Sequence, residues 1–224
     1  NTGSTATGSF TLEGSGLDAT TPAWTTIIAP EAVIAGSLNA KGLYMGLGAG
    51  SFTQSATAGA VRGTTPAATD TPRATALSVT PAGGIFADSI KIDSQSSNGN
   101  GTVRVFGEMA ANNGNLAVNA DGVIGVNGRL SASGDLTLAT TSNGNSKNVA
   151  VADIQLIDGA VTSGGNMSIA ADGSIVFNGG QIYSFNDLTL GGQTFVDQST
   201  SNPAQFNNTR FAGDDLNFNI SGDM

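Results

Sequence analysis

Apolar and polar residues alternate in two similar stretches of the chain, GNLAVNADGVIGVNG at residues 114–128 and GNMSIAADGSIVFNG at residues 165–179. Eight of the fifteen positions are identical, and the copies begin 51 residues apart. In the first copy Leu116 and Val118 are two positions apart, and a period of two is typical of a β-strand. The Asp-Gly and Asn-Gly pairs that follow favour turns. Each copy therefore predicts two short strands separated by a turn.

The same strand opening recurs at shorter intervals. Leu136 follows Leu116 by 20 residues, Leu188 follows Met167 by 21, and a further copy, GDDLNF, stands at 213–218. In this alignment Asp214 takes the turn position that Asn115 and Asp135 take in their copies. A second type of strand precedes these openings and is centred on Leu130, Val161 and Ile182.

Three short strands per roughly 20 residues predict an all-β parallel solenoid, whose coils stack about 4.8 Å apart and bury ladders of aliphatic side chains. A β-sandwich is the alternative. It would have turns about every 8–12 residues and would not show a sustained 20-residue repeat. In the solenoid the 51-residue spacing corresponds to two coils plus an insertion, which we place at 139–152.

Composition excludes several kinds of chemistry. The chain has no cysteine and no histidine, so disulfides, thiolate or imidazole metal sites and Ser-His-Asp arrangements are impossible. The net charge is −9, and the eight Lys and Arg residues are scattered singly, which argues against nucleic acid or an anionic membrane as a partner. No apolar run is long enough to predict insertion into a membrane.

Paired carboxylates are the one catalytic arrangement that the composition leaves open. Asp214 and Asp215 are adjacent and suit the acid and base of a carbohydrate-active β-helix enzyme, although a turn explains them better. Asp121 and Asp172 occupy equivalent positions and suit either a calcium site or an Asp-Gly turn. Three aromatic residues are candidates for stacking on sugars or for the core: Trp24, Tyr44 and Tyr183. We assign no catalytic, metal or cofactor-binding residue, and we expect no cofactor.

The first half of the chain resembles a known family. GLDA stands at 16–19, TTIIAPEAVIAGSLNAKGLYMGLGAG at 25–50 and GGIFADSIKI at 83–92. In this order the motifs resemble the end of the secretion domain of filamentous-haemagglutinin-like exoproteins of two-partner secretion, which include adhesins and contact-dependent inhibition proteins. The resemblance implies a right-handed parallel β-helix. Pro30 replaces the family's usual Arg, and the early Asn-Pro-Asn motifs are missing, so we interpret the chain as a piece.

The resemblance and the prolines together predict the domain organisation. Residues 1–50 are expected to form the end of the secretion-domain-like helix and 83–224 the downstream coils of one continuous solenoid. Residues 51–82 hold three of the six prolines and are expected to form a loop or hairpin outside it. Residues 191–207 are predicted to form a second insertion besides 139–152.

The resemblance also implies a function. We expect a structural rod and secretion segment of a large bacterial exoprotein, secreted or displayed on the outer membrane, with no enzymatic activity. Its expected partner is an outer-membrane two-partner secretion transporter, and a host or neighbouring-cell receptor would bind through other segments. A carbohydrate-active β-helix enzyme or a polysaccharide-binding protein similar to a phage tail spike is the alternative, and turnover of a polysaccharide would distinguish them.

Overall fold

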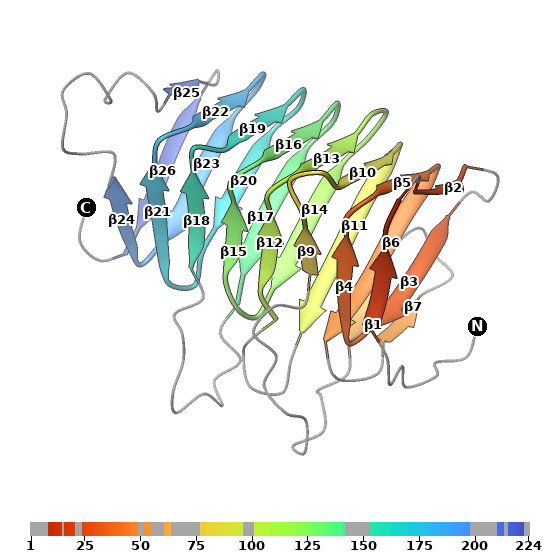
Figure 1. Ribbon diagram of the computed structural model, residues 1–224. Helices are drawn as coiled ribbons and strands as arrows, with labels where there is room; N and C mark the ends of the chain where they lie inside the picture. Colours follow the sequence, from red (N-terminus) through yellow and green to blue (C-terminus); the bar gives the residue numbers. More distant parts are fainter. Residues whose placement is uncertain are drawn as a thin grey trace, which may run out of the picture.

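The computed structural model describes residues 9–14, 16–20, 24–48, 52–54, 61–63, 77–95, 101–141, 153–197, 210–212 and 215–221. Within these residues the chain forms three parallel sheets of eight strands each and one antiparallel strand pair (Figure 1). Every strand pair in the three large sheets is parallel, which confirms the predicted β-helix and excludes a sandwich of antiparallel sheets.

The strands are short and follow one another through the sheets in strict rotation. The first sheet contains β1 (Ser9–Leu12), β4 (Glu31–Ile34), β9 (Leu77–Val79), β12 (Val103–Val105), β15 (Ile124–Val126), β18 (Ile154–Ile157), β21 (Ser174–Asn178) and β24 (Thr194–Asp197). The second contains β2 (Leu17–Ala19), β5 (Ser37–Ala40), β10 (Gly84–Ala87), β13 (Glu108–Ala111), β16 (Arg129–Ala132), β19 (Ala160–Ser163), β22 (Gln181–Ser184) and β25 (Arg210–Ala212). The third contains β3 (Thr25–Ala29), β6 (Gly42–Gly48), β11 (Ser89–Gln95), β14 (Leu116–Ala120), β17 (Leu136–Thr140), β20 (Met167–Ala170), β23 (Leu188–Gly192) and β26 (Leu216–Ile220).

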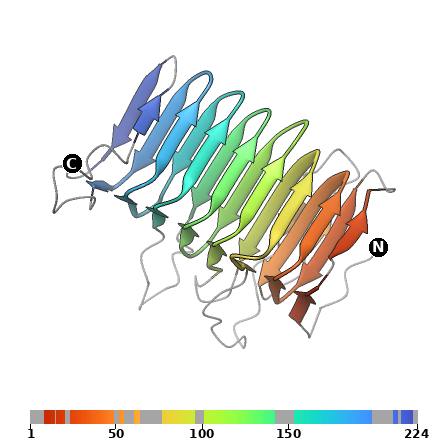
Figure 2. The same ribbon diagram turned by 45° about the horizontal axis from the view of Figure 1, so that its top comes forward.

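Each coil contributes one strand to each sheet, and eight coils stack along the axis (Figure 2). Leu116 pairs with Leu136, 20 residues later, and Leu136 pairs with Met167, 31 residues later. These two steps account for the 51-residue spacing of the repeated stretch. The predicted second type of strand is confirmed as well, because Leu130, Val161 and Ile182 pair in sequence along the second sheet.

Aliphatic side chains of equivalent positions form continuous ladders inside the helix. Leu116, Leu136, Met167 and Leu188 pair along the third sheet, and each is at most 1% exposed. Burial of such a side chain contributes about 1.5–3 kcal/mol. Because every coil buries its apolar residues against the coils beside it, the solenoid is stabilised as a stack rather than coil by coil.

Each of the three ranges expected to lie outside the coils contains residues that form strands of the solenoid. Leu77–Val79 lies in the predicted excursion, yet it forms β9 and pairs with β4 and β12. Within the same range β7 (Phe52–Gln54) and β8 (Val61–Gly63) pair with each other in antiparallel fashion. Ala139 and Thr140 belong to β17, and Thr194–Asp197 forms β24, so these parts of the predicted insertions are strands of the solenoid.

Three corners separate the sheets, and each has its own chemistry. The glycine corner joins the first sheet to the second, and a glycine stands directly before β5, β10, β13, β16, β19 and β22: Gly36, Gly83, Gly107, Gly128, Gly159 and Gly180. The Asx corner joins the second sheet to the third and carries Asn115, Asp135, Asn166 and Asp187. The insertion corner joins the third sheet to the first strand of the next coil and contains the long connections 49–76, 96–102 and 141–153.

Side chains of the Asx corner bond each coil to the next. The backbone N–H of Asp135 donates to Oδ1 of Asn115 (2.9 Å), that of Asn166 to Asp135 (2.9 Å), and that of Asp187 to Asn166 (3.3 Å). Leu188 pairs with Leu216, and its N–H donates to the carbonyl of Asp215 (2.8 Å). Asp215, and not Asp214 as the sequence alignment predicted, therefore continues this column.

Candidate binding groove at the glycine corner

The glycine corner is narrow because successive coils approach closely there. The N–H of Glu108 donates to the carbonyl of Gly83 (3.2 Å), and the N–H of Arg129 to the carbonyl of Gly107 (2.9 Å). A Cβ atom on Gly107 would overlap the carbonyl oxygen of Gly83, and one on Gly128 would overlap that of Gly107. Only glycine fits in this column, so the corner has a floor of bare backbone.

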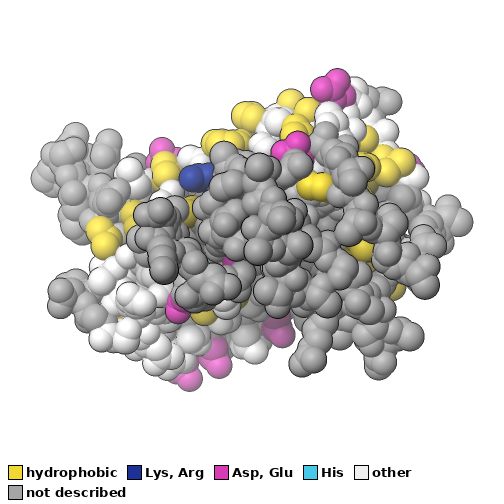
Figure 3. Space-filling view, turned by 90° about the horizontal axis from the view of Figure 1, so that it is seen from below, with side chains coloured by type: hydrophobic (Ala, Val, Ile, Leu, Met, Phe, Trp, Pro, Cys, Tyr) yellow, Lys and Arg dark blue, Asp and Glu magenta, His cyan; other side chains and the backbone are white. Residues whose placement is uncertain are grey.

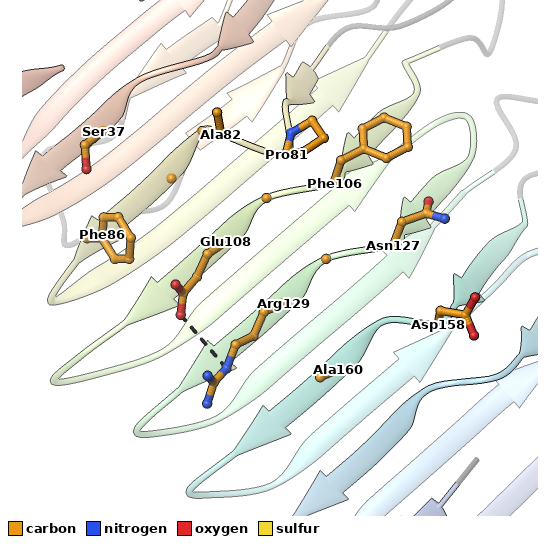
Figure 4. A pocket seen from close by; sticks show the side chains of 14 residues that line it. Ser37, Pro81, Ala82, Phe86, Phe106, Glu108, Asn127, Arg129, Asp158 and Ala160 are labelled. Atoms are coloured by element: carbon orange, nitrogen blue, oxygen red, sulfur yellow. Dashed lines mark ion pairs between the residues drawn. The ribbon is translucent and has the colours of Figure 1, made fainter. Parts of the chain in front are cut away.

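Side chains rise on both sides of this floor and form a groove (Figure 4). Phe106, Asn127 and Asp158 stand directly before a glycine and lie along one wall. Asp158 adopts φ of +53°, a left-handed conformation that Asp tolerates better than most residues.

The opposite wall comes from the outer face of the second sheet. Phe86 of β10, Glu108 of β13 and Arg129 of β16 lie along it. The ring of Phe86 lies directly over Gly84, because a Cβ atom on that glycine would contact the ring at 2.5 Å.

The groove has a volume of about 630 Å³ and spans turns and strands of five successive coils, from Ser37 of β5 to Ala160 of β19. Arg129 Nε lies 3.9 Å from Glu108 Oε1, and both side chains are largely exposed, so this ion pair contributes at most about 1 kcal/mol. The ring of Phe106 is 42% exposed. The groove thus combines two aromatic rings with a carboxamide, two carboxylates and one guanidinium, which is a set of side chains suited to binding a polar ligand with apolar faces.

The structure separates Asp121 from Asp172, whereas the pair Asp214 and Asp215 is only partly described. Asp215 is exposed beside the Asx corner, whereas Asp214 lies outside the described residues. Asp121 is 2% exposed and accepts a hydrogen bond from the N–H of Gly101 (2.7 Å). Asp172 is exposed, two coils further along, and its N–H donates to Thr140 Oγ1 (3.2 Å). In the part of the chain that the structure describes, no three acidic residues gather closely enough to hold a metal ion.

The aromatic candidates lie away from the groove. Tyr44 is fully buried, and burial, followed by the nearby charge of Asp93, raises the pKa of its hydroxyl far above its ordinary value. Its ring is therefore not accessible to a ligand. Trp24 precedes β3 in the first coil and Tyr183 lies on β22 in the seventh, and both are partly exposed.

Sequence reasoning missed the groove, although the sequence contains a signal for it. A glycine precedes each strand of the second type, as in Asn127-Gly128 before Leu130 and Asp158-Gly159 before Val161. Considered one at a time, the repeated Asn-Gly pairs predict only ordinary turns. Aligned on Leu130, Val161 and Ile182 instead, the glycines form a column, and a column without side chains at the corner of a solenoid predicts a groove.

Comparison with known proteins gives one relative. No family model matches the chain, and no solved structure matches it. The chain is 29% identical over 180 residues to tRNA nuclease CdiA of Escherichia coli (strain NC101), a match that covers 80% of this chain and 5% of that protein. No helix among the described residues is long and apolar enough to cross a membrane.

This comparison corrects one prediction. The expectation that the protein is not an enzyme is wrong on this comparison, because the relative that the chain matches is named as a nuclease. The match supports the coarser part of the family resemblance and leaves open which region of such a protein the chain corresponds to. Over four-fifths of its length, the chain is similar to a contact-dependent inhibition protein.

Proposed function

We propose that this chain is a rod segment of a much longer bacterial protein of the contact-dependent inhibition type, secreted or displayed on the cell surface through an outer-membrane two-partner secretion transporter. Two observations support the proposal: the similarity to CdiA over 80% of the chain and the order of secretion-domain-like motifs between residues 16 and 92. Recognition of a receptor by other segments of the longer protein belongs to the same proposal.

In this proposal the longer protein is an enzyme, as its relative is. The chain spans only 5% of the length of the relative, so tRNA cleavage by the whole protein is part of the proposal. The contribution of the present chain is to carry and space the functional parts of that protein outside the cell.

For the rod and its export, the observation that carries the proposal is the continuous register of eight coils. Each strand of a new coil pairs with its equivalent in the coil before, as β17 does with β14 and β20 with β17. A chain that emerges from a transporter in an extended form finds three such strand edges already formed. Folding therefore proceeds coil by coil outside the membrane, which favours outward movement over return.

The experiment compares two adjacent positions of β17 in the full chain, expressed together with its transporter. Leu136 is fully buried and Thr137, which faces outward, is partly exposed. Leu136→Asp places an unpaired charge in the core and is expected to destabilise the fold by more than about 4 kcal/mol and to reduce export strongly. Thr137→Asp serves as the control and is expected to be exported at nearly the wild-type level.

Export is measured as the fraction of the chain outside the cell, and folding as resistance to protease. Equal export and equal protease resistance of the two variants would contradict the role of coil-by-coil folding. Export of the wild-type chain at the same level without any transporter would contradict the secretion route itself.

A further inference from the structure

The groove at the glycine corner has a composition that the rod function does not require. We propose that it binds a neutral, linear oligosaccharide, with the Phe86 and Phe106 rings against the apolar faces of the sugars. This inference goes beyond the proposed rod function and does not depend on it, because it rests only on the geometry of the groove.

The two rings provide the apolar part of the site. Phe106 occupies the turn between β12 and β13, where Asn127 and Asp158 stand in later coils, so the turn itself does not require an aromatic residue. Its ring is 42% exposed, although burying a phenylalanine is worth about 1.5–3 kcal/mol. The ring of Phe86 lies next to the backbone of Gly84 on the outer side of β10, and the residue is partly exposed. The C–H faces of sugar rings are apolar and suit flat aromatic surfaces of this kind.

The polar side chains match hydroxyl groups rather than a charged ligand. Asn127 both donates and accepts hydrogen bonds, Glu108 and Asp158 accept, and Arg129 donates. A sugar hydroxyl also both donates and accepts, so it finds partners on both walls. The two carboxylates outnumber the single guanidinium, and the chain as a whole carries a net charge of −9. On the face of the molecule that Figure 3 shows, most of the charged side chains are acidic. These charges disfavour phosphate, sulfate and nucleic acid.

The shape of the groove favours a chain of sugars over a single one. Its lining residues come from five successive coils, which stack about 4.8 Å apart, so the groove extends roughly 19 Å along the axis. Its volume of about 630 Å³ lies within the usual range for ligand sites.

A peptide is a poorer occupant because the floor offers no free strand edge. Along the corner the backbone N–H groups of Glu108, Arg129 and Ala160 already donate to glycine carbonyls of the preceding coil. A peptide that binds as an added strand needs such groups unpaired, and here they are paired. A ligand in the groove must therefore bind to the outward side chains rather than to the backbone. A sugar binds in this way, through its hydroxyl groups and its apolar faces.

The experiment measures binding of four hexasaccharides to the purified 224-residue chain by NMR titration or calorimetry. Three are neutral and consist of β-linked glucose, α-linked glucose or N-acetylglucosamine, and the fourth is a sulfated heparin fragment. At least one neutral hexasaccharide is expected to bind, and more tightly than the heparin fragment. Phe106→Ala is expected to weaken that binding about tenfold or more, because it removes one stacking surface.

Two further variants keep the result interpretable. Asn127→Ala removes hydrogen bonds from the same wall and is expected to weaken binding severalfold, with the fold checked by circular dichroism. Tyr183→Ala removes a comparably exposed ring of the second sheet outside the groove and is expected to leave binding unchanged. Absence of binding to all three neutral probes, tighter binding of the heparin fragment, or equal loss in Tyr183→Ala would each overturn the proposal. Export of these variants tests the rod function separately.

Discussion

The glycine corner and the insertion corner connect the same coils, yet they obey opposite rules. Five turns of the glycine corner contain two residues, and the second of them is always glycine, as in Asn127-Gly128. At the insertion corner the connection varies from a single residue, Pro30 or Gln193, to the whole of residues 49–76. The length of the connection varies at the insertion corner, whereas at the glycine corner it stays at two residues from β12 to β22.

The physical difference lies in what holds each corner together. At the glycine corner backbone meets backbone, and the close approach leaves no room for a side chain. At the insertion corner side chains bridge the coils in addition to backbone hydrogen bonds: Asp121 accepts from the N–H of Gly101, and Asp153 accepts from the N–H of Ser174 (2.7 Å). A side chain can reach across connections of different lengths, whereas a backbone contact requires one geometry. A single repeat can therefore combine one corner of fixed length, which forms a site, with another corner whose length varies.

The largest expected effect comes from a side chain at the fixed corner. Gly128→Val places Cβ where the carbonyl oxygen of Gly107 lies, so the two coils must separate. We expect the free energy of unfolding to fall by about 3 kcal/mol or more, as measured by urea denaturation. Gly191→Ala is the control, because the nearest atom to its Cβ would be 3.8 Å away, and we expect a change below about 1 kcal/mol. Equal effects of the two substitutions would contradict the fixed corner.

The second prediction compares insertions at the two corners. Four residues, Gly-Ser-Gly-Ser, are inserted between Asn127 and Gly128 in one variant and between Asp172 and Gly173 in the other. The first is expected to lower the free energy of unfolding by about 2 kcal/mol or more, because it displaces the backbone contacts of the column. The second is expected to lower it by about 1 kcal/mol or less, the cost of lengthening a loop. The reverse order in thermal or urea unfolding would contradict the difference between the two corners.

The smallest effect is a pH dependence at the insertion corner. Burial raises the pKa of the Asp153 carboxyl, and its hydrogen bond from Ser174 opposes this only in part. The folded state therefore binds the proton more tightly than the unfolded state, and the free energy of unfolding falls as pH rises from about 4 through the raised pKa. Asp153→Asn keeps an oxygen acceptor and removes this fall. We expect the variant to gain stability relative to the wild type between pH 4 and 7, and a constant difference across that range would refute the assignment.

Much of the fold could be predicted from the sequence because it depends on local pattern. Period-two apolar residues such as Leu116 and Val118, with an Asx turn before each opening, specify a strand and its inward face without knowledge of the rest. The position of Asp215 could not be assigned in this way, because the GDDLNF motif allows two alignments and only the pairing of Leu188 with Leu216 decides between them.

The groove is harder to predict than the strands, and for a different reason. It depends on which outward residues of successive coils become neighbours, and the insertions make those residues irregularly spaced in the chain. Gly83, Gly107, Gly128 and Gly159 are separated by 24, 21 and 31 residues, so they show no fixed period. Tyr44 shows the same difficulty in reverse, since an outward position on β6 is buried in the structure.

The strands of all three sheets run across the long axis of the helix, while the hydrogen bonds between coils run along it. A tensile force applied between the two ends therefore loads these bonds one layer at a time, in the manner of a zipper rather than in shear. Such a protein yields by peeling single coils, and each coil that peels away lengthens the chain without unfolding the layers beneath it.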